Sequence, residues 1–476
     1  MVYNNITMVF RFYDTYSRRK KIFRPLDNKR VKMFVCGPTV YDLPHLGHLR
    51  TYLFYDFLAR FLKQNGFDVF YLQNITDIDD KIINRAREEK ISPRQLALKY
   101  EKEYLKDIKN LKIKSVNKYA RATSYINQIQ DQIRRLIKKG YAYQTSDGIY
   151  YNISKFKDYG KLSKRTINKT YSATSRIDDS ILKINKGDFC LWKFKKDDEP
   201  FWKFEYGDGR PGWHIEDTAI SEYHFGFQYD IHGGAVDLIF PHHEAEIAQM
   251  EALSGKKPMV KYWIHTGFLL VNGEKMSKSL GNFLTIREVL KTNSVQTLRF
   301  FIASYHYHSP IDFTNDLLLQ AKESLERITS FYYQVLDAKN KNFKLPISQE
   351  KAHLAKIKFF EEKFWKYLAD DFNSPLAISQ IFNLIKYFYK QDKGILKNPK
   401  INKEIFEFLK KFNEIFDVLE TKALVIPKKV TILLDKRENL RKNKEYEKAD
   451  ELRKKIVELG YEVLDTPEGT KIKKIK

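Results

Sequence analysis

Two short motifs carry the chemistry that this sequence most clearly offers. In the first, His45 and His48 flank Leu46-Gly47, where a loop leads into a predicted helix of about residues 49–63. Imidazole groups at a helix N-terminus stabilise negative charge, and a glycine such as Gly47 lets a ligand approach the backbone, so the motif suits a bound triphosphate. Histidine pairs on helices are also common as structural residues, and the motif alone leaves both interpretations open.

The second motif is KMSKS at residues 275–279, which follows a turn at Asn272-Gly273. Lys275 and Lys278 on such a loop offer mobile positive charges to a leaving pyrophosphate. A solvated basic loop would have the same composition. The order and separation of the two motifs together favour a nucleotide-dependent catalytic site.

The segment that carries the first motif predicts a βαβ unit. An apolar strand at 33–36 leads through the motif loop into the helix, Asn65-Gly66 ends the helix, and a second strand follows at 69–72. This order predicts an α/β fold with a parallel sheet whose ligands bind at the carboxyl ends of its strands. Cys36 lies at such an end.

The rest of the chain divides by composition. A polar stretch interrupts the sheet pattern, and a helical region begins near Leu317, with apolar residues at helical spacing: Leu325, Ile328, Phe331, Tyr332 and Val335. Another helix is predicted to start with Ser374 as its cap, a linker is predicted at 339–351, and one long basic helix is expected to end at Gly460. The predicted segments are 1–115 and 206–270 (the two halves of the catalytic domain), 116–205 (an insertion), 271–316 (the KMSKS loop and a stem-contact region), 317–425 (a helical bundle) and 426–476 (a small basic segment).

Length and composition indicate a multidomain protein of the cytoplasm. The chain has 476 residues and 43% hydrophobic residues, and no apolar run approaches the ~18 residues that a membrane span needs. The N-terminus lacks the basic-then-apolar order of a signal peptide. Only two cysteines occur, which is too few for a disulfide framework.

The formal charge of +25 favours a polyanionic partner such as nucleic acid. The chain is also rich in Lys, Asn, Ile, Tyr and Phe, the residues of A/T-rich codons, and this bias accounts for part of the excess. Charge by itself therefore supports RNA binding only weakly.

The two motifs resemble the HIGH and KMSKS signatures of class I aminoacyl-tRNA synthetases. The stretches CGPTVYDLPHLGH, NITDIDDKI, GRPGWHIE, DIHGGAVDLIFPHHEAEIAQ and GEKMSKSLGNF are similar to the cysteinyl-tRNA synthetase family in particular, from about Val31 to Asp371 and again at the terminal DTPEGT. The resemblance implies a Rossmann-like catalytic domain with an insertion, followed by a C-terminal α-helical anticodon-binding domain.

The resemblance also implies one zinc ion that binds the sulfur of the substrate cysteine, with Cys36, Asp217, His242 and Glu246 as its ligands. Cysteine, histidine and carboxylate side chains are competent zinc ligands, and His242 and Glu246 share one helical face. Asp217 departs from the family pattern, which has a second cysteine there. A carboxylate keeps the negative charge but replaces a soft ligand with a hard one; the alternative is that Asp217 only caps or hydrogen-bonds and the metal is lost.

Other site residues follow from the resemblance. Those implied for cysteine binding are Cys36, Thr76 and Trp213, and those implied for ATP binding are Gly47, His232, Gly233, Gly234, Asp237 and Lys278. Trp213 could equally be a core residue. Cys190 matches no functional position and is interpreted as packing. His243-Glu244 lacks the second histidine that a metalloprotease motif requires.

The implied reaction has two steps and no covalent enzyme intermediate. The carboxylate of cysteine attacks the α-phosphate of Mg-ATP, and the adenylate is transferred to the 3′-terminal adenosine of tRNA(Cys), first to its 2′-hydroxyl. His45, His48, Lys275 and Lys278 are the expected catalytic residues, and a monomer is expected. Two rival functions remain: a ligase that joins cysteine to a small amine, for which the long basic C-terminal region has little use, and an inactive RNA-binding paralogue.

Overall fold

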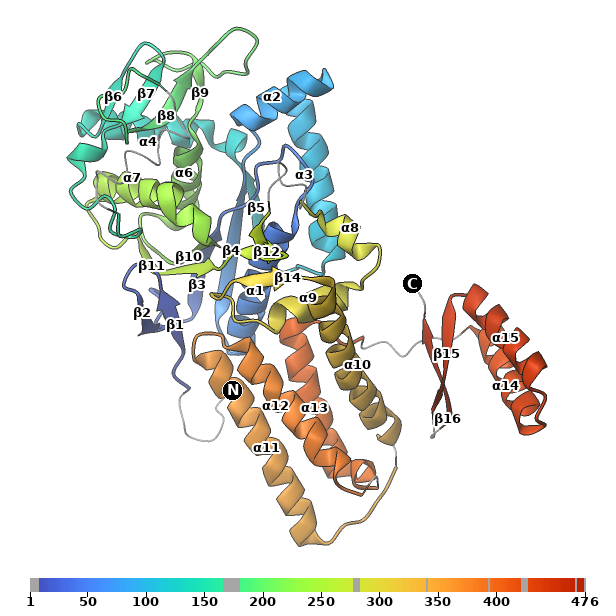
Figure 1. Cartoon of the computed structure of the whole chain (residues 1–476). Helices are drawn as coiled ribbons and strands as arrows, with labels where there is room; N and C mark the ends of the chain where they lie inside the picture. Colours follow the sequence, from blue (N-terminus) through green and yellow to red (C-terminus); the bar gives the residue numbers. More distant parts are fainter. Residues whose placement is uncertain are drawn as a thin grey trace. The chain divides into compact units, whose positions relative to one another are not determined.

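The computed structural model describes residues 8–165, 180–276, 283–339, 341–392, 394–420, 427–466 and 469–474. The chain forms two compact units, Met1–Val418 and Leu419–Lys476. Figure 1 shows a sheet with helices around it, an insertion and a helical bundle in the first unit, and a small helix-and-hairpin structure in the second.

The catalytic-domain sheet has five parallel strands in the order β11-β10-β3-β4-β5. Their bounds are Arg30–Val35 (β3), Asp68–Ile75 (β4), Lys118–Arg121 (β5), Tyr229–Ala235 (β10) and Val260–Thr266 (β11). The predicted βαβ unit is confirmed as β3, helix α1 (Leu46–Gln64) and β4. Strand β4, the next strand of this sheet along the chain, lies on one side of β3, and β10 lies on the other side of β3. The strand order therefore reverses between β3 and β10. Ligands of open parallel sheets bind at such a reversal.

The insertion begins later than the sequence indicates. We placed its start at residue 116, but β5 at Lys118–Arg121 pairs in parallel with β4 and completes the main sheet. The strand was missed because only Ala120 of its four residues is buried, which leaves no apolar pattern to read. Beyond it lies a four-stranded antiparallel sheet: β6 (Ala142–Gln144), β7 (Gly148–Tyr151), β8 (Phe189–Phe194) and β9 (Gly209–Pro211). Cys190 is buried in β8, as expected of a packing residue.

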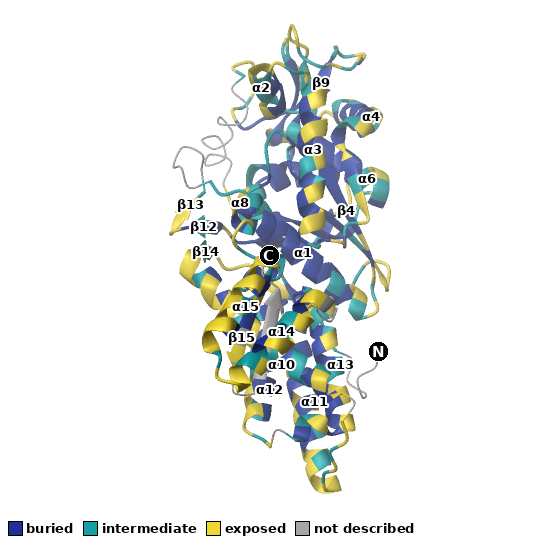
Figure 2. Cartoon of the chain, turned by 90° about the vertical axis from the view of Figure 1, so that its right-hand side faces the viewer, coloured by how far each residue is buried: buried dark blue, intermediate teal, exposed yellow. Residues whose placement is uncertain are grey.

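Helices cover both the sheet and the insertion. Helix α1 is buried along most of its length, and Figure 2 shows it in dark blue. The others are α2 (Asp80–Glu89), α3 (Pro93–Asn110), α4 (Ile126–Lys138), α6 (Trp213–Phe225) and α7 (Glu244–Ser254). After β11 come β12 (Leu269–Val271), β13 (Glu274–Lys275), α8 (Ile286–Leu290), α9 (Val295–Ala303) and β14 (Ile311–Phe313), and an N-terminal hairpin is formed by β1 (Arg11–Asp14) and β2 (Arg19–Ile22).

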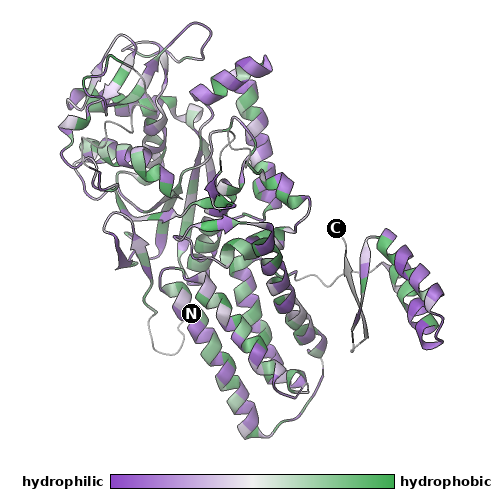
Figure 3. Ribbon diagram, viewed as in Figure 1, coloured by the Kyte–Doolittle hydropathy of each residue, from purple (hydrophilic) through white to green (hydrophobic). Residues whose placement is uncertain are grey.

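Four long helices form the bundle: α10 (Asn315–Ala338), α11 (Ile347–Ala369), α12 (Ser374–Tyr389) and α13 (Pro399–Phe416). The predicted apolar face of α10 is confirmed, since all five of its named residues are buried, and Figure 3 shows hydrophobic and hydrophilic residues alternating along these helices. The cap of α12 is Asn373, not Ser374, because the Asn373 side chain accepts from Leu376 N at 3.2 Å. The linker predicted at 339–351 joins α10 to α11. Because both of these helices pack on α13, the segment connects two helices of one bundle and does not separate two domains.

The second unit contains two helices where the sequence predicts one. Helix α14 (Lys428–Lys442) ends at a turn in which Lys444 has φ of 62°, and α15 (Tyr446–Glu458) follows. A hairpin of β15 (Tyr461–Thr466) and β16 (Gly469–Lys474) completes the unit. Arg437 fixes the hairpin to α14 through a bidentate pair with Asp465 at 2.6 and 2.9 Å. Within the described residues, no helix combines the length and the apolar composition that crossing a bilayer requires.

A buried ion network joins the motif helix α1 to the bundle. Asp56 on α1 accepts from Arg299 on α9 at 3.0 Å and pairs with Arg60 at 2.9 Å, and both Asp56 and Arg299 are fully buried. The guanidinium of Arg299 also donates to the carbonyl oxygens of Leu111 and of Phe416, the last residue of α13. Burial alone would raise the pKa of Asp56, but the charges of Arg299 and Arg60 and the Ser115 hydroxyl hold it below its usual value.

Replacing Asp56 with Asn should therefore lower the free energy of unfolding by about 3 kcal/mol at pH 7, because Arg299 is left buried without its counter-charge. The folded-state pKa of Asp56 is depressed, so its stabilisation is present above the unfolded-state pKa and is lost as the pH falls through the folded-state value. Urea unfolding at several pH values should show the gap between wild type and Asp56→Asn closing toward low pH. The control Asp68→Asn removes an exposed partner of Arg30 and should change stability by about 0.5 kcal/mol or less.

Candidate active site

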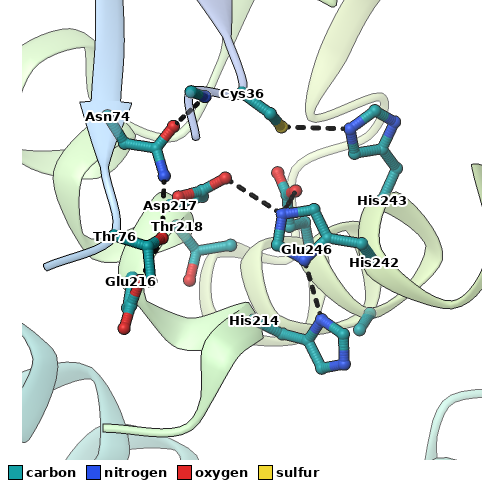
Figure 4. Close-up of polar contacts among 12 residues, drawn as sticks. Cys36, Asn74, Thr76, His214, Glu216, Asp217, Thr218, His242, His243 and Glu246 are labelled. Carbon is teal, nitrogen blue, oxygen red and sulfur yellow. Dashed lines mark hydrogen bonds and ion pairs between the residues drawn. The ribbon is translucent and has the colours of Figure 1, made fainter. Parts of the chain in front are cut away.

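The reversal of strand order brings two strand ends together at the site. Cys36 follows β3, and its backbone N–H donates to Gly233 O in β10 at 3.0 Å. Asp217 comes from α6, His242 from a turn of π-helix before α7, and Glu246 from the first turn of α7. One ligand atom from each of these four side chains lies within 4.8 Å of the others, and all four residues are buried (Figure 4). The structure thus brings together the four residues predicted as metal ligands.

The buried carboxylates of this cluster are not satisfied by protein groups alone. Asp217 Oδ1 and both carboxylate oxygens of Glu246 have no hydrogen-bond donor among the described residues, although His242 Nε2 lies 3.0 Å from Asp217 Oδ2 and 3.2 Å from Glu246 Oε1. Burial raises the pKa of Cys36 well above its usual value, and the charges of Asp217 and Glu246 raise it further; burial and then Asp217 also raise the pKa of Glu246. A buried group of thiol, imidazole and unpaired carboxylates fits a divalent cation.

A second group of possible ligands overlaps the first. Cys36, His232, His243 and Glu246 also place their ligand atoms within 4.8 Å of one another. Cys36 Sγ lies 3.1 Å from His243 Nε2 and 3.4 Å from His232 Nε2, which is itself 3.4 Å from Glu246 Oε2. The ring of His232, a residue that the resemblance implies for ATP binding, thus lies inside the buried cluster.

Further buried side chains orient the imidazoles of both groups. His214 Nδ1 lies 2.8 Å from His242 Nδ1, and the Trp213 ring stacks on His242 with centroids 4.3 Å apart. On the other side, Tyr229 contacts His232 Nδ1 at 2.6 Å, and His265 contacts His243 Nδ1 at 2.8 Å. Such outer contacts fix which ring nitrogen faces a metal. Sequence reasoning missed His214, His243, Tyr229 and His265; the only signal was the number of histidines in apolar segments.

The two glycines predicted at the ATP site have a packing reason. A β-carbon on Gly233 would lie 2.2 Å from the Tyr55 ring, and one on Gly234 would lie 2.9 Å from Leu238 and 3.0 Å from His243. The side chains of Tyr55, Leu238 and His243 therefore favour glycine at these two positions. Asp237 is exposed just beyond β10.

The HLGH motif begins helix α1 as predicted. His45 is the N-cap, its Nδ1 accepts from Gly47 N at 3.1 Å, and its ring stacks on that of His48 with centroids 3.9 Å apart. Burial, followed by the neighbouring charges of His45 and Lys81, lowers the pKa of His48 well below its usual value. A cavity of about 160 Å³ opens here, lined by both histidines together with Tyr41, Lys81, Tyr104 and Phe283. The two imidazoles, each of which accepts a backbone N–H at its Nδ1, and the ammonium group of Lys81 give this cavity donors for an anion.

The segments on either side of the KMSKS loop lie against this motif. Leu46 N donates to Leu284 O at 3.2 Å, Ile286 N donates to Pro44 O at 3.3 Å, and the Phe283 ring packs on His45 at 5.3 Å. A β-carbon on Gly47 would lie 3.5 Å from Met276 Cε. Lys275 ends β13 with its ammonium over the Phe268 ring at 4.7 Å, whereas Lys278 lies outside the described residues. Met276 of the second motif and the segment that follows the motif thus lie against the first.

Family models match most of this architecture. Residues 22–323 match the tRNA synthetases class I (C) catalytic domain, and residues 363–420 match the DALR domain. The Mycobacterium tuberculosis methionyl-tRNA synthetase in complex with methionyl-adenylate has the same fold, with a TM-score of 0.64 at 16% identity over 82% of this chain and 92% of that chain. The parallel sheet, the paired motifs and the helical bundle define a class I aminoacyl-tRNA synthetase.

Curated relatives identify the family within that class. The cysteine–tRNA ligase of Thermococcus gammatolerans is 43% identical over 482 residues, which cover 98% of this chain and 100% of that protein. That of Thermoplasma acidophilum is 44% identical over 465 residues, covering 97% of this chain and 99% of that protein. The chain belongs to the cysteine–tRNA ligase family. Neither rival function is favoured by these matches.

Gly233→Ala should lower the free energy of unfolding by about 2 kcal/mol or more, because the added methyl group overlaps the Tyr55 ring and the core must shift. Urea unfolding without ATP or cysteine measures this loss directly. The double variant Gly233→Ala/Tyr55→Val should be destabilised by less than the sum of its single changes. Equal stability of Gly233→Ala and wild type would show that the Tyr55 ring does not require a glycine at this position.

Proposed function

We propose that the chain activates L-cysteine with Mg-ATP and transfers the cysteinyl group to the 3′-terminal adenosine of tRNA(Cys). The observation that carries the proposal is the buried cluster of Cys36, Asp217, His242 and Glu246 at the strand-order reversal, in a chain of the cysteine–tRNA ligase family. The cluster supports a subsite for the substrate thiol. The neighbouring HLGH cavity supports a subsite for phosphates.

Zinc is the metal that we assign to the cluster, with Cys36, Asp217, His242 and Glu246 as its ligands. The unpaired carboxylate oxygens of Asp217 and Glu246 support this set, and His214 orients His242 toward it. When bound, the ion supplies a Lewis-acidic site that prefers the sulfur of cysteine to the hydroxyl of serine, which shape alone separates poorly. Trp213, whose ring stacks on His242, and Thr76 are proposed to line the subsite for cysteine.

The phosphates of ATP would bind between the two motifs. His45 and His48 donate to the phosphate oxygens, and Lys275 and Lys278 stabilise the charge that develops on pyrophosphate as it leaves. Gly47, His232, Gly233, Gly234 and Asp237 remain proposed contacts of ATP. Catalysis by these groups is electrostatic and depends on their positions.

The helical bundle and the basic C-terminal segment would bind the tRNA. The positive charge of the chain supports contact with phosphates, and the DALR match covers all of α12 and α13. We propose a monomer, since one chain supplies all four ligands of the cluster. Both cysteines are buried and neither forms a disulfide, which supports a reducing location such as the cytoplasm.

ATP–pyrophosphate exchange screened against all amino acids tests the proposed substrate. Exchange should depend on cysteine and should discriminate against serine by at least about 10³-fold, because a site built around a metal–sulfur contact leaves serine without that contact. Metal content is measured on the same sample. Exchange that responds to another amino acid and not to cysteine would refute the assignment.

Asp217→Ala should lower the zinc content of the purified protein and raise the KM for cysteine, whereas Asp217→Cys should retain both metal and exchange. Zinc is measured by elemental analysis, with the exposed Asp68→Ala as the control. His243→Asn separates the two overlapping ligand groups, since it should keep the metal. Loss of zinc in His243→Asn with full zinc in Asp217→Ala would assign the second group instead.

A further inference from the structure

We propose that Glu216 is a positioning residue that fixes the Thr76 hydroxyl as an acceptor for the α-ammonium group of the amino-acid substrate. The inference rests on the proposed activation of cysteine and adds a residue to which the resemblance assigned no role. Glu216 directly precedes Asp217 on α6, is fully buried, and accepts from Thr76 Oγ1 at 2.9 Å (Figure 4).

Thr76 lies between the two subsites that the substrate must span. Its backbone pairs with the wall of the HLGH cavity: Thr76 N donates to Pro38 O at 3.1 Å, and Val40 N donates to Thr76 O at 3.2 Å. Its side chain faces α6, beside the metal cluster. A cysteine with its sulfur at the cluster and its carboxylate directed to the phosphates carries its amino group in the region between them. Thr76 and Glu216 occupy this region.

A chain of hydrogen bonds sets the direction of the Thr76 hydroxyl. Gly37 N, next to Cys36, donates to Asn74 Oδ1 at 2.5 Å, and Asn74 Nδ2 donates to Thr76 Oγ1 at 3.5 Å. Because the hydroxyl hydrogen of Thr76 is donated to Glu216, only a lone pair remains for the substrate. A donor must therefore bind there. With its thiol at the cluster, cysteine offers the ammonium group as its donor, since its carboxylate only accepts.

The surroundings of Glu216 indicate function in preference to stability. Its second oxygen, Oε1, has no hydrogen-bond partner among the described residues, and a half-satisfied buried carboxyl costs stability. Glu244 on α7 provides a contrast, because it is equally buried but both of its oxygens accept, from Leu162 N and Ser163 N. Glu244 thus stabilises a loop, whereas the half-satisfied carboxyl group of Glu216 lowers the stability of the fold.

The test compares variants in cysteine-dependent ATP–pyrophosphate exchange and in calorimetric binding of cysteine. Glu216→Met should raise the KM for cysteine about tenfold, because losing one hydrogen bond to a charged group weakens binding by about that factor. The KM for ATP should stay unchanged. Glu216→Gln keeps a carbonyl oxygen that can accept from Thr76 and should stay within about threefold of wild type. The melting temperature of Glu216→Met should equal or exceed that of wild type, whereas the control Glu244→Gln should melt lower with an unchanged preference for cysteine.

Two further comparisons show whether Glu216 acts through Thr76 and on the amino group. The double variant Glu216→Met/Thr76→Val should lose no more affinity for cysteine than Thr76→Val alone. The analogue 3-mercaptopropionate, which has the thiol and the carboxylate but no amino group, should bind wild type and Glu216→Met equally.

Three results would overturn the inference: an unchanged KM for cysteine in Glu216→Met, an equal loss of affinity for 3-mercaptopropionate, or a full additional loss in the double variant. Failure of the proposed function would look different, since wild type would then show no cysteine-dependent exchange. In that case the calorimetric comparison of cysteine with 3-mercaptopropionate still decides the role of Glu216.

Discussion

The parallel pairing of β3 with β10 is the constraint on which the active site depends. It brings Cys36 and His232 into contact although 196 positions separate them in the chain. The two strand ends then leave a crevice, and α6 and α7 can deliver polar side chains into it only because their other faces pack in the core. The site is therefore a product of sheet topology, because residues from the end of β3, from α6, from the turn before α7 and from α7 meet there.

Burying these polar groups opposes folding, and the fold offsets the cost with the surrounding apolar core. Carboxylates, a thiol and several imidazoles lie at the centre of the first unit with few charge partners among the described residues. A cation bound there would compensate the charge and also stabilise the native state over the unfolded chain. The chemistry of the site and the stability of the unit are for this reason coupled.

Much of this could be predicted from residue types and their order. The βαβ unit around HLGH and the apolar face of α10 follow from local periodicity, and the four predicted ligands were inferred from the resemblance of the stretches around them to the cysteinyl-tRNA synthetase family. The parts that were missed depend on contacts across the chain. The role of His232 depends on which face of β10 meets Cys36, and β5 has a single buried residue. The break between α14 and α15 depends on one left-handed lysine, and the need for Gly233 depends on Tyr55, 178 residues earlier. Such facts are set by tertiary packing, which local patterns do not encode.

The ion network of Asp56 and Arg299 restricts how this protein can change over time. Either residue alone can be replaced only by leaving an uncompensated charge in the interior, whereas an apolar pair of similar volume could replace both with little loss. A single substitution at either position therefore destabilises the protein. Replacing the pair requires either a destabilised single variant as an intermediate or a change of both residues together. Arg299 also donates to the last residue of α13. As long as Asp56 and Arg299 are kept, the motif helix and the bundle therefore stay joined while residues elsewhere change.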